Sequence, residues 1–312
     1  MPSDPTPRTR WLFAVTSVAA IAVALLPTGH IDIIGGHARP IVLPADTSSE
    51  SGTYLLATAT LRHRTVAQTI WHRLSLGIHQ SRAASNHGTS MADAKAHAWN
   101  AARAIVGPSL TVVQVRSPSP AARAGLEIGD IVTDISGHAP TVGAIDRGLS
   151  FGDTVRLRVL RGGIAHDVEL RPTPPYPQPL GGGATYAPTS GPVAAPPLDT
   201  GGIEGDSAGL LLALAYVDLL TPGDLTGGAK VAATGTVNDA GALTGVLGYS
   251  AKADAVARQG AALFLVPADD IDAATTRAPQ NLRIVGVHSV VHAVFELCGV
   301  GGVSSVCSNY PN

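Results

Sequence analysis

Apolar and polar positions in the first part of the chain follow the period of a strand and then that of a helix. The run from Gly52 to Leu61 is rich in Thr and Leu and predicts a strand, and the residues from Thr65 to Leu76 predict a helix. After a polar loop, alanines recur at helical spacing from Met91 to Ile105. Ser90 is placed to cap this helix, and Gly107-Pro108 is placed to end it.

Short strands separated by turns are the pattern of the next segment, residues 107–171. The expected elements are a strand at Leu110 to Val115, a helix near Ala144 to Leu149, a strand in which Val155, Leu157 and Val159 alternate with arginines, a turn at Gly162-Gly163 and a strand from Val168 to Leu170. Residues 172–197, with consecutive glycines at 181–183, are rich in Pro and Gly and predict a linker or a long loop.

Two helices are expected in the last part of the chain. Ala208 to Leu220 is an apolar run that Pro222-Gly223 stops. Ser250 is placed to cap a second helix from Ala251 to Gln259, which Gly260 closes. A side chain at the start of either helix would stand beside backbone N–H groups that have no partner within the helix.

An uncharged apolar segment, Trp11 to Leu26, lies near the N-terminus. Its length falls between the core of a signal peptide and the ~20 residues of a full membrane span, and either interpretation implies export. A retained transmembrane anchor over residues 11–27 is favoured because no clear small-residue cleavage context follows; a cleaved signal peptide is the alternative. Arg8 and Arg10 place residues 1–10 in the cytoplasm and predict a single-pass protein of the cell membrane, with everything after Thr28 outside the cytoplasm.

The composition adds three points to this picture. Charged residues make up 14% and aromatic residues 4% of the 312 residues, with 35 Gly and 23 Pro, so small side chains are expected to fill the core. The formal net charge of -2, without a dense basic cluster, argues against nucleic acid as a partner. A Gly-rich spacer separates Cys298 from Cys307; export would favour a disulfide, and two unpaired thiols are the alternative.

The segment from Ser119 to Val132 combines a Ser-Pro-Ala-Ala start, a Gly-Leu turn and a Gly-Asp pair that opens a strand, and it resembles bacterial PDZ domains. The resemblance implies a PDZ domain over residues 107–171 that takes a peptide C-terminus as an added strand. The loop that holds the peptide carboxylate is expected just before Val112. Residues 107–110 contain a proline there and lack the usual apolar-Gly-apolar form, so a structural or gating role stays open.

Separated motifs from Gly202 onward resemble the proteolytic domain of Lon proteases, particularly small membrane-anchored bacterial relatives that also carry a PDZ module. The motifs are Glu204 to Gly209 for the nucleophile segment, Leu225 to Gly228 and Ala233 to Val237 for the middle strands, Gly241 to Lys252 for the lysine segment, and Gly260 to Ala262 with Leu265 to Ala268 for the strand that follows. The chain departs from the family at Leu247, where most members have Gly, and at Ala251, where Glu is usual. These departures are expected to change the shape of the substrate groove, and they remove neither of the two reacting side chains.

The resemblance implies an α+β fold, in which a Lon-type proteolytic domain with a PDZ domain follows an N-terminal membrane segment. Residues 198–312 would form the catalytic part and residues 45–106 its N-terminal part, so that the PDZ domain is an insertion. Ser207 would be the nucleophile and Lys252 the general base. A ring-shaped homo-oligomer is the assembly that the analogy with Lon suggests.

The chemistry of the residues supports the same assignment independently. A serine needs a base within about 2.6 to 3.2 Å to take its proton, and a lysine can act as that base only when it is deprotonated. A position in the first turn of a helix and burial among Val246, Leu247 and Ala255 both predict a lowered pKa for Lys252. Backbone N–H groups beside Ser207 would hold the oxyanion.

Supporting roles are expected for three further residues near this pair. Thr234, and with less force Asp206, would orient the amine, although a carboxylate too close to the amine would raise its pKa. Gly205 belongs to the turn that leads into the helix. No metal or other cofactor is implied, and the absence of a P-loop motif predicts that ATP is not used.

These observations predict an ATP-independent, membrane-anchored serine endopeptidase that cleaves exported or membrane-proximal proteins. Gly205 to Gly209 also fits the nucleophile elbow of α/β-hydrolases, with His288 or His292 as the base, but Pro196-Pro197 argues against the buried strand that an elbow needs. The two histidines lack a third ligand and predict no metal site. A non-catalytic exported PDZ scaffold is the other alternative.

Overall fold

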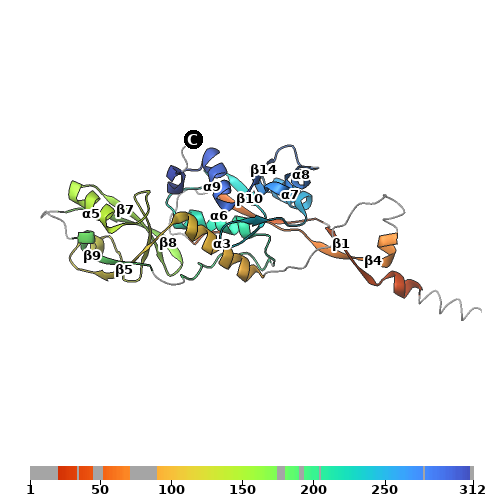
Figure 1. Ribbon diagram of the computed structural model, residues 1–312, viewed down its shortest axis with the longest axis horizontal. Helices are drawn as coiled ribbons and strands as arrows, with labels where there is room; N and C mark the ends of the chain where they lie inside the picture. The colour runs from red at the N-terminus through yellow and green to blue at the C-terminus, as the bar shows by residue number, and fades with distance from the viewer. Residues whose placement is uncertain are drawn as a thin grey trace, which may run out of the picture. The chain divides into compact units, whose positions relative to one another are not determined.

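The computed structural model describes residues 20–33, 35–44, 52–70, 90–173, 180–189, 193–203, 205–276 and 278–309. The chain forms two compact units (Figure 1). The first unit contains Met1–Gly36 and Ala59–His87, and the second contains His37–Thr58 and Gly88–Asn312.

The first unit contains one two-stranded antiparallel sheet, in which β1 (Pro27–Ile33) pairs with β4 (Leu61–Thr65). Residues 20–24 are helical, and they carry largely exposed apolar side chains. Among the residues that the structure describes, no helix is both long enough and apolar enough to cross a membrane. Most of the predicted anchor, residues 11–19, lies outside the described residues, as does the end of the helix predicted for residues 65–76, of which 66–70 are helical.

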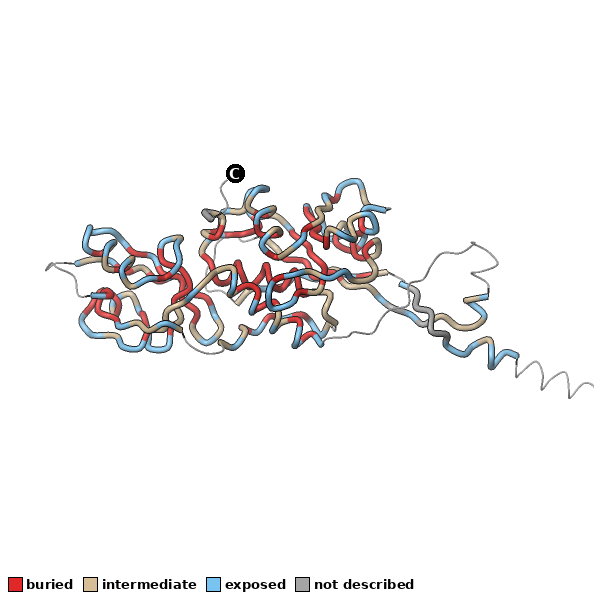
Figure 2. The backbone as a smooth tube through the Cα atoms, viewed as in Figure 1, coloured by how far each residue is buried: buried red, intermediate tan, exposed pale blue. Residues whose placement is uncertain are grey.

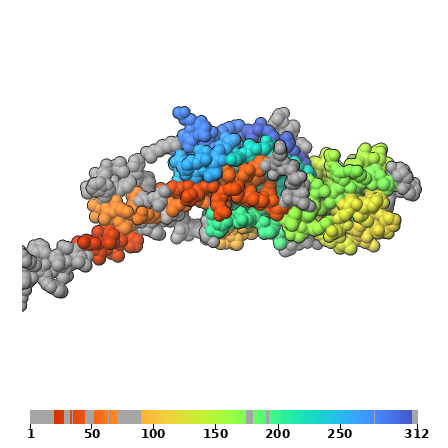
Figure 3. Space-filling model, turned by 180° about the vertical axis from the view of Figure 1, so that it is seen from behind, coloured from red at the N-terminus to blue at the C-terminus, as the bar shows by residue number. Residues whose placement is uncertain are grey.

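The second unit contains a mostly parallel five-stranded sheet with the order β14-β13-β10-β3-β2. Its strands are β2 (Ala38–Ile41), β3 (Thr53–Ala57), β10 (Lys230–Ala233), β13 (Leu263–Pro267) and β14 (Arg283–Val287). Because β3 pairs with β10, segments before and after residues 107–197 share one sheet. In Figure 3 the orange-red part of the chain, which contains β2, lies beside the blue part, which contains α7 (Tyr249–Arg258). Strand β2 and helix α7 are in contact.

The strand predicted over residues 52–61 is wrong in extent. Its first half is β3, in the five-stranded sheet, and its last residue begins β4, in the other unit. The apolar pattern could not reveal this division, because the break at residues 58–60 keeps the residue types of a strand.

Helices cover both faces of the five-stranded sheet. Tyr54 and Leu56 of β3 pack into one apolar cluster, while Leu55 and Ala57 pack into another, as the alternation of side chains in a strand requires. The first face is covered by α3 (Met91–Val106), α6 (Gly209–Leu220) and α9 (Val290–Gly299), and the second by α7 and α8 (Ile271–Thr275). Every residue of α6 is buried, which Figure 2 shows as a continuous red helix.

The helix predicted from Met91 to Ile105 is confirmed as α3, and Ser90 caps it as expected. The Ser90 hydroxyl accepts a hydrogen bond from the Asp93 amide, and the Asp93 carboxylate accepts one from the Ser90 amide. Reciprocal bonds of this kind satisfy two of the N–H groups that a helix start leaves unpaired.

A second sheet, antiparallel throughout, has the order β8-β7-β6-β5-β9 and a core of its own. Its elements are β5 (Leu110–Val115), α4 (Pro120–Arg123), β6 (Ile131–Ile135), α5 (Val142–Phe151), β7 (Val155–Arg161), β8 (Ile164–Leu170), the 3-10 turn η1 (Leu180–Gly183) and β9 (Ala184–Pro188). The prediction of a linker over residues 172–197 is therefore wrong in part, because β9 lies within it. A short strand in a Pro/Gly-rich segment gives little signal when its partner lies far away in sequence.

The second sheet contacts the C-terminal end of α6 through buried polar side chains. Thr133 of β6 donates to the Leu220 carbonyl oxygen at 2.7 Å. Arg158 of β7 donates to the Thr221 carbonyl oxygen at 2.9 Å and forms a two-point ion pair with Asp167 at 2.7 and 2.9 Å. These bonds satisfy carbonyl groups that the helix end leaves unpaired.

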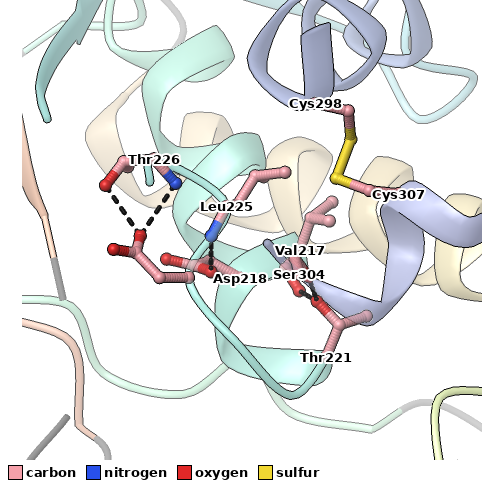
Figure 4. The surroundings of a disulfide bond; sticks show 9 residues. Val217, Asp218, Thr221, Leu225, Thr226, Cys298, Ser304 and Cys307 are labelled. Carbon is pink, nitrogen blue, oxygen red and sulfur yellow. Dashed lines mark hydrogen bonds between the residues drawn. A yellow bond between two sulfur atoms is a disulfide. The ribbon is translucent and has the colours of Figure 1, made fainter. Parts of the chain in front are cut away.

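A disulfide between Cys298 and Cys307 closes a loop over the same helix end (Figure 4). Within this loop, the Ser304 hydroxyl lies 2.7 Å from the Thr221 hydroxyl, and the Ser305 hydroxyl donates to Asp134 of the second sheet at 3.0 Å. The structure thus contains the disulfide rather than two unpaired thiols.

Replacing Arg158 with Ala is expected to lower the free energy of unfolding by about 2 to 3 kcal/mol, because the Thr221 carbonyl and the Asp167 carboxylate both lose their donor. Arg156 on the same strand is the matched control: its side chain is 76% exposed, and Arg156→Ala should change stability little. Chemical denaturation of both variants measures the difference. Equal losses would contradict a special role for Arg158 at this contact.

Candidate active site and peptide-binding edge

Ser207 lies directly before helix α6, as the sequence predicts. The helix begins at Gly209 with Ala208 as its N-cap residue, and Ser207 is half-buried. Gly205 enters this turn with a φ of 101°, a backbone conformation that favours glycine. A Cβ atom on Gly209 would lie 2.8 Å from the Val237 amide nitrogen, so only glycine allows the helix to approach this closely.

The start of α6 is hydrogen-bonded to the residues that follow β10. The Ser207 carbonyl oxygen accepts from the Gly235 amide at 2.9 Å and from the Thr234 hydroxyl at 3.0 Å. The Gly235 carbonyl oxygen in turn accepts from the Leu210 amide at 3.0 Å. The backbone of Ser207 is therefore fixed against the end of the central strand of the sheet.

Lys252 reaches the same point from helix α7. Its amine donates to the Thr234 hydroxyl at 2.9 Å, and the side chains of both residues are buried. The Thr234 hydroxyl accepts from Lys252 and donates to the Ser207 carbonyl oxygen, so a single hydroxyl bridges the two predicted catalytic residues. The structure thus brings Ser207, Thr234 and Lys252 together.

The predicted N-cap of the lysine helix is wrong. Helix α7 begins at Tyr249, and its N-cap is Gly248, with a left-handed φ of 84° that a glycine adopts without strain. Ser250 instead donates from its hydroxyl to the Thr276 carbonyl oxygen at 3.3 Å. Lys252 remains in the first turn, where its amide donates to the Gly248 carbonyl oxygen.

Tyr249 and Asp270 hold the loop before Lys252, and no motif in the sequence marks them as part of the site. The Tyr249 hydroxyl donates to the Asp270 carboxylate at 2.9 Å and accepts from the Val246 amide at 3.0 Å. Gly245 lies so close to the same carboxylate that no Cβ atom would fit. A fixed backbone at the start of α7 fixes where the lysine side chain begins.

Burial lowers the pKa of Lys252 from its ordinary value of 10.5 to about 8. Removing the ammonium group from water is the larger cause, and the Asp206 carboxylate acts in the opposite direction. Asp206 also accepts the Gly209 amide on its backbone carbonyl oxygen, at 3.1 Å. The residue therefore supports the turn while its charge opposes deprotonation of the amine.

His288 and His292, the bases that the α/β-hydrolase alternative requires, lie next to each other. Their rings stack with centroids 5.6 Å apart, and His292 lies 3.6 Å from the Glu296 carboxylate. Among the described residues, no hydrogen bond joins either histidine to Ser207, and no group of three or more His, Cys, Asp and Glu side chains is placed to hold a metal ion.

Strand β9 forms one edge of the second sheet, next to β5. The carboxylate loop expected just before Val112 is wrong in position, because β5 pairs with β6 on one side and β9 on the other. In the part of the chain that the structure describes, β8 and β9 are the two edge strands of this sheet, and the glycine turn η1 directly precedes β9.

Replacing Lys252 with Met tests the burial of the amine without any assay of catalysis. Between pH 8 and 10.5 the unfolded chain keeps the Lys252 proton and the folded chain releases it, so the stability of the parent protein rises with pH across this window. Met is uncharged, so Lys252→Met should be more stable than the parent at pH 7, by an amount on the order of 3 kcal/mol. This advantage should shrink towards pH 10, as measured by urea denaturation.

The other titrating groups are present in both the parent and Lys252→Met, so their contributions to the pH dependence cancel in the stability difference between the two proteins. A difference between parent and Lys252→Met that stays constant from pH 7 to 10 would mean that the folded-state pKa of Lys252 is not lowered.

Comparison with protein families matches residues 76–171 to the family described as PDZ domain. No curated protein matches the chain. The matched range includes β5 to β8 and α5 but ends before η1 and β9, and it includes neither Ser207 nor Lys252. The chain therefore contains a PDZ domain beside a second module of mixed α/β structure.

Proposed function

We propose that the chain is a serine endopeptidase in which Ser207 is the nucleophile and Lys252 the general base. The observation that carries this proposal is the buried amine of Lys252, which shares the Thr234 hydroxyl with the backbone of Ser207. An amine with a pKa of about 8 is neutral in a substantial fraction of molecules near pH 8, and a neutral amine can take a proton. The motifs that resemble Lon proteases support the same pair.

The proposed reaction has two halves. The Lys252 amine takes the proton of the Ser207 hydroxyl while Oγ forms a bond to the peptide carbonyl carbon, and the ammonium then gives this proton to the leaving amine as the C–N bond breaks. Water attacks the acyl-enzyme with the same base and restores the serine. Because Lys252 donates one N–H to Thr234, Thr234 holds the amine so that its lone pair is available to the nucleophile.

The oxyanion would be held by backbone N–H groups that precede the helix. The amides of Gly209 and Leu210 already donate to the carbonyl oxygens of Asp206 and Gly235. We therefore assign this role to the amides of Ser207 and Ala208, the two residues that directly precede Gly209.

The PDZ domain would select substrates. PDZ domains typically bind peptides by adding them to a sheet as a strand, and β9 offers the edge at which this can happen. Bound segments would be delivered to a module that contacts the PDZ sheet through Thr133 and Arg158.

We further propose that residues 11–27 anchor the protein in the cell membrane, with the PDZ and catalytic parts outside the cytoplasm. Ile21, Val23, Leu25 and Leu26 are largely exposed apolar residues, which suit a lipid environment. The disulfide supports the same location, because disulfides persist in oxidising compartments. The sequence has no P-loop motif, so the proposed enzyme works without ATP on substrates that are already accessible.

Acylation by a fluorescent fluorophosphonate and cleavage of a casein peptide mixture together test this proposal. Ser207→Ala should abolish both, and Lys252→Ala should lower both by roughly 10²- to 10⁴-fold, the usual contribution of a general base. His288→Ala is the matched control and should retain the parent rate. In the parent, the acylation rate should rise with pH through about 8, as the Lys252 amine loses its proton.

Each variant also separates the alternatives. Loss of acylation in Ser207→Ala and His288→Ala but not in Lys252→Ala would favour the α/β-hydrolase chemistry. Acylation that survives in Ser207→Ala would exclude both the Ser207–Lys252 mechanism and the α/β-hydrolase mechanism, because each uses Ser207 as the nucleophile. A parent protein that binds peptides but neither reacts nor cleaves would favour the non-catalytic PDZ scaffold.

A further inference from the structure

The glycine turn before β9 has the form of an anion-binding site. Gly181, Gly182 and Gly183 have φ values of 61°, 66° and 88°, a succession of left-handed residues that only glycine adopts readily. Turns of successive backbone N–H groups bind carboxylates and phosphates, and such turns capture peptide C-termini.

This turn already holds a carboxylate from its own chain. The Gly181 amide donates to Oδ1 of Asp146, a half-buried residue of helix α5, and the Tyr186 hydroxyl donates to the Gly181 carbonyl oxygen at 3.1 Å. Asp146 therefore occupies the position at which the carboxylate of a bound peptide would meet the N–H group of Gly181.

The glycine turn is packed against the core of the second sheet. All three glycines are buried, and a Cβ atom on Gly182 would lie 2.8 Å from a methyl group of Leu170 and 3.1 Å from one of Leu149. An incoming terminal carboxylate would also meet the negative charge of Asp146, and like charges at short range repel.

A peptide does not need a free C-terminus in order to add to β9 as a further strand. A peptide that adds to an edge strand gains main-chain hydrogen bonds along its length, and its side chains set the specificity. Leu180 at the start of η1 and Phe151 at the end of α5 are 80% and 77% exposed, and these two elements are in contact. They provide exposed apolar surface on the glycine turn and on the helix that contacts it, for the side chains of an extended segment.

We propose that this PDZ domain takes internal extended segments of unfolded proteins in preference to C-termini, and that Asp146 sets the preference by filling the glycine turn. The inference rests on the peptide-binding part of the proposed function and not on the Ser207–Lys252 pair. It gives an endopeptidase a recognition module that does not require a free chain end.

Peptide binding to the full chain tests the proposal in a Ser207→Ala background, so that no peptide is cleaved. The probes are fluorescein-labelled random decapeptide libraries, one with a free C-terminal carboxylate and one with a C-terminal amide, followed by fluorescence polarisation. With Asp146 present, the two libraries should bind within about twofold of each other. In Asp146→Ala the free acid should bind about tenfold more tightly than the amide, because a charged carboxylate gains the Gly181 N–H group.

Two further variants complete the design. Asp146→Asn keeps an acceptor for Gly181 without the charge and should give a smaller preference for the acid. Asp153→Ala removes an exposed carboxylate just after α5 and should leave the acid-to-amide ratio unchanged. If Asp146→Ala fails to fold, as judged by circular dichroism, Asp146→Asn carries the test.

Several results would overturn the proposal. They are a tenfold or greater preference for the free acid with Asp146 present, an unchanged ratio in folded Asp146→Ala and Asp146→Asn, and no binding of either library. Because the background has no nucleophile, none of these results depends on whether the chain is a peptidase.

Discussion

The withdrawal of the Lys252 amine from water is the constraint on which the candidate site depends. A buried ammonium is costly unless partners compensate it, and here the Lys252 amine has a hydrogen bond to the Thr234 hydroxyl and the electrostatic influence of the Asp206 carboxylate. The protein therefore stabilises the neutral amine. The surrounding residues hold the amine in one position. Gly248 turns the chain into α7, and Tyr249 and Asp270 hold that turn. Thr234 joins the amine to the backbone of Ser207.

The two modules of the second unit meet at the other end of the helix that follows Ser207. Helix α6 is buried along its whole length, and its last carbonyl groups accept hydrogen bonds from Thr133 and Arg158 of the PDZ sheet. The disulfide loop covers the same end through Ser304 (Figure 4). The PDZ domain is thus packed onto the mixed α/β module by buried polar contacts, and a peptide bound at β9 would be held by a sheet that touches the helix of the proposed nucleophile.

Sequence reasoning succeeded where local chemistry decides the outcome. The α3 helix and its Ser90 cap follow from neighbouring residues, and the burial of Lys252 follows from the apolar residues near it. The sequence-based predictions were wrong where contacts with residues far away in the sequence determine the structure. Ser250 has the residue type of an N-cap, but the left-handed Gly248 and the Tyr249–Asp270 contact set the helix start, and β9 forms only because β5 lies beside it. The sequence predicts the carboxylate turn before β5 because no local pattern reveals that β9 flanks that strand.

The protonation of the Lys252 amine in the folded protein is the most direct test of the proposal that Lys252 is the general base. The chain has only two other lysines, Lys95 and Lys230, so NMR of protein labelled with ¹³C at lysine Cε gives few signals, and the signal lost in Lys252→Met identifies the residue. We expect a titration midpoint for Lys252 near pH 8. A midpoint near 10.5, the ordinary value for a lysine, would show that almost no neutral amine is present near pH 8 and would contradict the role of Lys252 as general base.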